Sequence, residues 1–198
     1  MQEEDATAGT DGLPIPECER RLAAGGVGIL ALAGVAAPVL RPVNFALHAG
    51  SIILRTGEGR ILEAAQLGEP ASFVLCEVDR FEHTGWSVVV TGKLRERSAL
   101  EDLDALQEEE ATAGTDGLPL PECERRLAAG GGGILALAGV AAPVLRPVNF
   151  ALHAGSIILR TGEGRILEAA QLGEPASFVL CEVDRFEHTG WSVVVTGK

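Results

Sequence analysis

The hydrophobic pattern changes its period several times along the first half of the chain and predicts short strands alternating with short helices. Apolar runs rich in valine and isoleucine are typical of strands. Apolar residues at helical spacing, with acids at the start and arginine or glycine at the end, are typical of helices. The predicted strands span residues 27–33, 38–47, 51–56, 71–78 and 86–91, and the predicted helices span 16–24 and 58–67. Five short strands, mostly joined by hairpins such as the turn at 48–50, indicate a mainly β fold, a small antiparallel barrel with small helices.

The same pattern recurs in the second half because the chain is a tandem repeat. Residues 2–93 recur as 107–198. The copies differ at three positions, Asp5 against Glu110, Ile15 against Leu120 and Val27 against Gly132. Because this period is far longer than that of a solenoid, each copy is expected to be a domain. We expect copy one at 1–93, a helical connector at 94–106 and copy two at 107–198.

Each copy is small, so it would bury only a modest fraction of its surface alone. We therefore expect the two copies to associate as a pseudo-dimer, because two-fold pairing would bury more apolar surface. This self-association can occur within one chain or by exchange between chains, and the sequence leaves both arrangements open. The connector itself has a capping-box pattern from Ser98 to Glu101 ahead of regularly spaced leucines, which predicts an amphipathic helix.

One uncharged stretch, residues 22–40, approaches the length of a membrane-spanning helix. Four glycines and Pro38 interrupt it, so two short strands joined by a turn are the better prediction, and no membrane partner is expected. The acidic start is unlike a signal peptide. None of the four cysteines lies in a C-x-x-C pair, which predicts free thiols and a cytoplasmic protein.

The net charge of −12 is spread evenly over the two copies, without a basic stripe. Nucleic-acid binding requires such a stripe, so we expect no nucleic-acid partner. Motifs of hydrolases and zinc peptidases are also missing from the sequence. The sequence therefore shows none of the usual catalytic constellations.

The segment between the third strand and the second helix has the composition of an anion site. Arg55, Thr56 and Arg60 surround two glycines at a helix N-terminus, where backbone amides favour a phosphate. Glu58 opposes this reading, and an ordinary turn with two exposed arginines is the alternative. Trp86 is either a core anchor or a ligand-stacking group. Residues 41–45 place arginine and asparagine in an apolar strand, which indicates a cleft-lining strand or a half-exposed one.

Four stretches in this order resemble one known family. They are ECERRLAAGGVGILAL at 17–32, VLRPVNFAL at 39–47, GSIILRTGEGR at 50–60 and GWSVVVTG at 85–92. Together they are similar to the pyridoxamine 5′-phosphate oxidase-like family of flavin-binding split β-barrels. The resemblance covers nearly all of each copy and implies two tandem FMN-binding split-barrel domains packed as a pseudo-dimer, with flavin sites in the cleft between them.

The resemblance also implies which residues bind the flavin. Arg41, Val43 and Asn44 would line the isoalloxazine ring, mainly through the backbone, while Arg55, Thr56 and Arg60 would hold the phosphate. Trp86 would approach the site from the partner barrel. The corresponding residues of copy two are Arg146, Val148, Asn149, Arg160, Thr161, Arg165 and Trp191. Arg60 stands where the family commonly has lysine, which changes the geometry of the charge.

The resemblance implies an oxidoreductase in which FMN exchanges electrons or hydride with a small-molecule substrate. FAD, deazaflavin F420 and haem are alternative cofactors. A second hypothesis is a carrier module that holds one of these groups without turnover. A third is a tandem barrel, engineered or degenerate, that binds no cofactor, because family members continue past the fifth strand whereas copy two ends at Lys198.

Overall fold

The computed structural model describes residues 12–79, 84–96, 118–184 and 189–198. Each copy contributes two helices and five strands. In copy one these are α1 (Ile15–Ala23), β1 (Gly26–Leu32), β2 (Val39–His48), β3 (Ser51–Leu54), α2 (Arg60–Leu67), β4 (Pro70–Asp79) and β5 (Thr84–Lys93). In copy two they are α3 (Leu120–Ala128), β6 (Gly131–Leu137), β7 (Val144–His153), β8 (Ser156–Leu159), α4 (Arg165–Gln171), β9 (Ala176–Asp184) and β10 (Thr189–Gly197). The predicted connector helix at 94–106 lies mostly outside the described residues.

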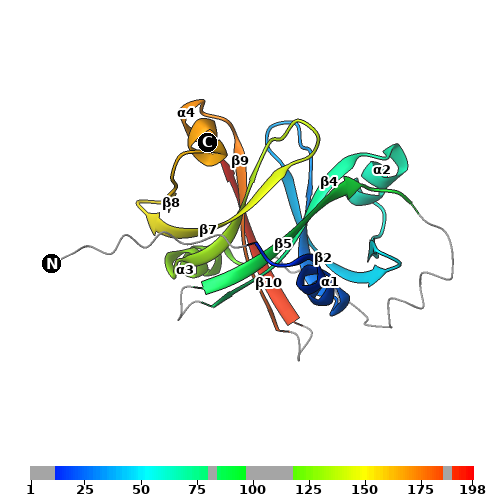
Figure 1. Cartoon of the computed structure of the whole chain (residues 1–198). Helices are drawn as coiled ribbons and strands as arrows, with labels where there is room; N and C mark the ends of the chain where they lie inside the picture. The colour runs from blue at the N-terminus through cyan, green and yellow to red at the C-terminus, as the bar shows by residue number, and fades with distance from the viewer. Residues whose placement is uncertain (1–11, 80–83, 97–117, 185–188) are drawn as a thin grey trace.

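Each copy folds into one antiparallel sheet that curls into a half-barrel (Figure 1). The strand order is β3-β2-β1-β4-β5 in copy one and β10-β9-β6-β7-β8 in copy two. The prediction of a mainly β fold of tandem split-barrel domains is confirmed. The uncharged stretch at 22–40 forms the end of α1, β1, a turn and the start of β2. No helix in the described part of the chain is long and apolar enough to cross a membrane.

Glycines set two boundaries around α2. Gly59 precedes the helix with φ 141°, a conformation that helical residues cannot adopt, so the helix begins at Arg60 rather than at the predicted residue 58. Gly68 ends the helix in the left-handed conformation with φ 64°. The loop at 55–59 is therefore longer than the sequence pattern indicated, because β3 also ends early, at Leu54.

Alternate side chains of the central strands point into two different cores. On β1, Leu30 and Leu32 pack inside the half-barrel of copy one, while Ile29 and Ala31 pack against copy two. Both faces of the strand are thus buried, which explains why its sequence is an unbroken apolar run rather than an alternating one. On β4, Val74 likewise belongs to the core that residues of both copies form together.

The shared core joins the two copies within this single chain. It contains Ile29, Ala31, Leu40 and Val74 from copy one and Ile134, Ala136, Leu145 and Val179 from copy two. Cys76 and Cys181 pack at its margin, and burial raises the pKa of the Cys76 thiol to about 12. All four cysteines are free, as the sequence predicted. A core made of equivalent residues from both copies is what a two-fold interface requires.

Candidate functional site

The outer edge of β2 is open where the flavin ring is predicted to lie. Along residues 39–45 β2 pairs with β1, but on its other side β3 pairs only with Phe45–His48. Within the described ranges, residues 39–44 therefore have no hydrogen-bonded strand partner on that edge, although β2 also contacts β9 of copy two. The free backbone N–H and C=O groups of an edge strand are available to a ligand. The same arrangement recurs on β7, which β8 covers only from Phe150 to His153.

The three predicted ring contacts lie on this stretch of β2 but point in different directions. Val43 packs against the core of copy one, whereas Arg41 and Asn44 are exposed. The guanidinium of Arg41 donates to the carbonyl oxygen of Leu40 at 3.0 Å. Arg146, Val148 and Asn149 repeat the arrangement in copy two. The backbone of this segment is its common accessible feature, which agrees with contacts made through the main chain.

The loop at 55–59 brings Arg55 and Thr56 to the surface ahead of α2. Both side chains are exposed, and among the described residues Arg55 makes no ion pair or hydrogen bond. Thr56 donates a hydrogen bond of 3.2 Å from its hydroxyl to the carbonyl oxygen of Gly57. No side chain caps the N-terminus of α2, so its first amides remain open to an anion. Arg160, Thr161 and the uncapped α4 repeat these features.

Arg60, the third predicted phosphate ligand, is already engaged. Its guanidinium forms a bidentate ion pair with Glu69, with Nη1–Oε1 3.2 Å and Nη2–Oε2 2.5 Å. The hydrogen bonds that Arg60 donates to the Glu69 carboxylate raise the pKa of Arg60. Arg165 pairs with Glu174 through a single contact, between its Nη2 and Oε2 of Glu174. The carboxylate that engages Arg60 is that of Glu69 and not that of Glu58, which the sequence suggested as the opposing charge. Glu69 lies beyond the helix, and no sequence motif marks it.

Trp86 faces helix α1 of its own copy. The Arg21 guanidinium carbon lies 3.9 Å from the centroid of the indole ring, a cation–π contact, and Arg21 also bonds to Glu17 at 2.7 Å. Trp86 packs at the margin of the copy-one core as well. Trp191 and Arg126 form the equivalent pair in copy two. These contacts fit an anchoring role, and an approach to the site of the other barrel remains a prediction.

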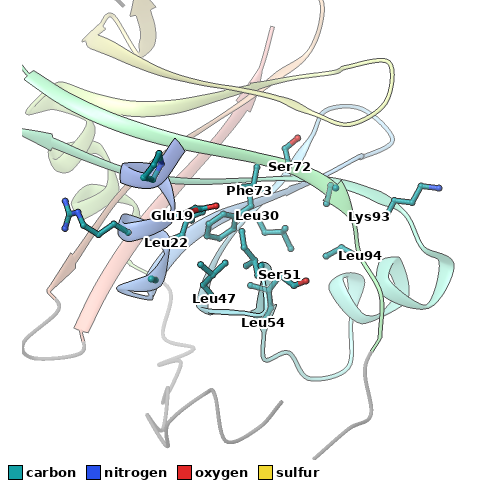
Figure 2. A pocket seen from close by; sticks show the side chains of 18 residues that line it. Glu19, Leu22, Leu30, Leu47, Ser51, Leu54, Ser72, Phe73, Lys93 and Leu94 are labelled. Atoms are coloured by element: carbon teal, nitrogen blue, oxygen red, sulfur yellow. The ribbon is translucent and has the colours of Figure 1, made fainter. Parts of the chain in front are cut away.

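A cavity of about 750 Å³ lies inside the half-barrel of copy one (Figure 2). Its walls are mainly apolar side chains, among them Leu22, Leu30, Leu47, Leu54, Phe73 and Leu94. None of the predicted flavin-binding residues lines it. The cavity reaches residues of both edge strands, β3 and β5, so we interpret it as the interior of an incompletely closed barrel. Three charged residues, Glu19, Arg20 and Lys93, also line the cavity.

The described residues contain no group of three or more His, Cys, Asp or Glu side chains arranged for a metal ion. What they offer is an open strand edge followed by a loop with a free arginine and an uncapped helix. These parts suit an elongated anionic ligand with a flat ring at one end and a phosphate at the other. The arrangement binds and orients such a ligand, and redox chemistry would have to come from the ligand itself.

Comparisons with known proteins give a family match. The family model described as pyridoxamine 5′-phosphate oxidase matches residues 15–116 and 119–198. Among solved structures, an FAD-binding protein from Mycobacterium smegmatis is similar at 28% identity and a TM-score of 0.41, covering 50% of this chain and 80% of that one. No curated protein matches the chain. Because the family model matches most of both copies, the chain belongs to the pyridoxamine 5′-phosphate oxidase family.

Proposed function

We propose that this protein binds two flavins, one per copy, and transfers electrons or hydride between the bound flavin and a small-molecule substrate. A flavin supplies the redox chemistry when bound, and the protein supplies position and electrostatics. The family assignment supports flavin binding in general. We place the protein in the cytoplasm, where free thiols such as its four cysteines persist.

The observation that carries the proposal is Arg55, which has no ion-pair or hydrogen-bond partner among the described residues. It lies beside Thr56 at the uncapped N-terminus of α2, and Arg160 repeats the arrangement at α4. A guanidinium with no carboxylate partner and a set of free helix amides form a cradle for a phosphate. A single cradle beside an open strand edge suits the one phosphate of FMN. We therefore favour FMN over FAD, deazaflavin F420 or haem.

In this proposal the backbone edge of β2 at Arg41–Asn44 orients the flavin ring, and the equivalent edge of β7 orients the second. Arg55 and Thr56 fix the phosphate end. No residue of the described chain is assigned to proton transfer.

The test is the double variant Arg55→Ala with Arg160→Ala. We expect FMN affinity to fall by roughly tenfold or more, because each site loses a charge-assisted hydrogen bond. The control is Arg20→Ala with Arg125→Ala, which removes the same charge from α1 and α3. Isothermal titration with FMN and with riboflavin, which lacks the phosphate, measures the effect. Equal FMN affinity in the two double variants would overturn the assignment of Arg55.

A carrier that holds flavin without turnover is the second candidate. It is favoured because the open strand edges at 39–44 and 144–149 carry no carboxylic acid, histidine or cysteine side chain. Anaerobic mixing of the flavin-loaded protein with NADH or NADPH separates the two candidates. Bleaching of the flavin absorbance supports the oxidoreductase, and an unchanged spectrum with both reductants supports the carrier.

A further inference from the structure

We propose that Arg60 and Arg165 do not bind the flavin phosphate but act as positioning residues, which fix the phosphate loops relative to the opposite copy. The proposal rests on the proposed function, because it concerns the same loops. It assigns the phosphate to Arg55 and Arg160 and gives the two helix arginines a different task.

The contacts of Arg60 join three separate elements. Arg60 is the first residue of α2, its ion-pair partner Glu69 lies just before β4, and its Nη2 also donates to the carbonyl oxygen of Ala33 at 3.3 Å. Ala33 follows β1, at the start of the β1–β2 hairpin. Arg165 makes the same three-way connection through Glu174 and the carbonyl oxygen of Ala138, at 3.2 Å. The planar guanidinium is thus engaged at both terminal nitrogens in copy one.

Electrostatics oppose a direct bond between Arg60 and a phosphate. A cation at the N-terminus of a helix is unfavourable, and the Glu69 carboxylate compensates it. A phosphate that approached Arg60 would bring a second negative charge beside that carboxylate. The pair is partly shielded, with side-chain exposures of 34% for Arg60 and 25% for Glu69, so this repulsion is only partly screened. In the part of the chain that the structure describes, Arg55 has no such carboxylate partner.

The hairpin that Arg60 holds continues into the interface between the copies. Its last turn residue, Pro38, accepts a hydrogen bond of 2.6 Å from the hydroxyl of Ser177 in copy two. A chain of contacts therefore runs from α2 through Arg60 and the hairpin to the opposite copy. The reciprocal chain runs from α4 through Arg165 to Pro143 and Ser72. A loop held by these contacts stays at a fixed distance from any ligand bound where the copies meet.

The decisive variant is Glu69→Gln with Glu174→Gln. If Arg60 binds the phosphate directly, removal of the competing carboxylate frees the guanidinium and strengthens FMN binding. If Arg60 positions the loop, the same change weakens FMN binding, and we expect a loss of roughly tenfold. Arg60→Ala with Arg165→Ala should weaken binding to a similar extent. The variant with all four changes should lose little more, because the two residues act as one unit.

Hydrogen–deuterium exchange without any flavin separates this proposal from the proposed function. We expect faster amide exchange over residues 55–64 in the Arg60 and Glu69 variants, and unchanged exchange in Arg55→Ala, which has no partner to lose. If the wild-type protein binds no flavin, the proposed function fails, and the exchange data alone decide the positioning role. Tighter FMN binding by Glu69→Gln with Glu174→Gln, or unchanged exchange in both the Arg60 and Glu69 variants, would overturn it.

Discussion

The hydroxyl group of Ser72 donates a hydrogen bond of 2.6 Å to the backbone carbonyl oxygen of Pro143 and so joins β4 of copy one to the β6–β7 hairpin of copy two. Ser177 bonds to Pro38 in the reciprocal direction. The two serines are 2% and 1% exposed, so neither bond is open to water. This reciprocity is the mark of a two-fold interface, here formed between two halves of one chain.

Replacing both serines, Ser72→Ala with Ser177→Ala, should destabilise the protein. Each change leaves a buried carbonyl without its serine donor, which costs about 1–3 kcal/mol. Urea unfolding followed by tryptophan fluorescence measures the loss. Ser51→Ala is the control, since Ser51 is exposed on the edge strand β3. A loss no larger than that of the control would mean that the bonds between the copies contribute nothing to stability.

The turn between β2 and β3 offers a stabilising substitution. Ala49 and Gly50 adopt φ values of 47° and 73°, the left-handed pair typical of a two-residue hairpin turn. Alanine is strained there, and asparagine tolerates the conformation. Ala49→Asn with Ala154→Asn should raise the free energy of unfolding by about 0.5–1 kcal/mol per turn.

Differential scanning calorimetry checks the turn prediction. Ala24→Asn is the matched control, because Ala24 has φ −70° and gains nothing from asparagine. A lower melting temperature for the Ala49 and Ala154 variant than for the control would show that the left-handed turn is not the one populated in solution.

Acid sensitivity should originate partly in the helices α1 and α3. Hydrogen bonds from Arg20 and Arg21 lower the pKa of Glu17 from 4.5 to about 2, and Glu122 behaves alike beside Arg125 and Arg126. A carboxylate whose pKa is lower in the folded state stabilises the fold above pH 4.5 and loses that contribution as the pH falls toward 2. Both glutamates are at the surface, so the effect is small and sensitive to salt.

Glu17→Gln with Glu122→Gln isolates this contribution. The melting temperature of the variant should lie below that of the wild type at pH 7, and the two should converge as the pH approaches 2, where the wild-type carboxyls are protonated. Glu19→Gln with Glu124→Gln changes the same charge on the same helices without an observed ion pair and serves as the control. A constant gap between variant and wild type at every pH would contradict the prediction.

The strands and helices could be predicted from the sequence because they depend on residues close together in the chain. The unbroken apolar run at 27–33, the turn at 48–50 and Gly68 each gave a correct element or boundary. The contacts that position the site did not follow, because they join residues that only the fold brings together. Arg60 meets Glu69 when the chain reverses from α2 into β4, and Arg21 meets Trp86 when α1 packs on β5. Neither pair has a sequence signature.

The family resemblance named site residues that local patterns did not predict. The structure was needed to distinguish these residues by their contacts. It named Arg55 and Arg60 together as phosphate ligands, and only the geometry distinguishes an unpartnered arginine from one held by a carboxylate. The resemblance did not predict the hydrogen bonds that Ser72 and Ser177 each donate to the other copy. Serine is a common strand residue, and its partner here is a backbone atom of the other copy.

Equilibrium dialysis of the purified chain against FMN, with the bound flavin counted by its absorbance, tests most directly whether each copy binds one flavin. We expect retention of two FMN molecules per chain and weaker retention of riboflavin, because both copies carry the phosphate loop. A protein that retains no FMN, or that holds FMN and riboflavin equally well, would contradict it.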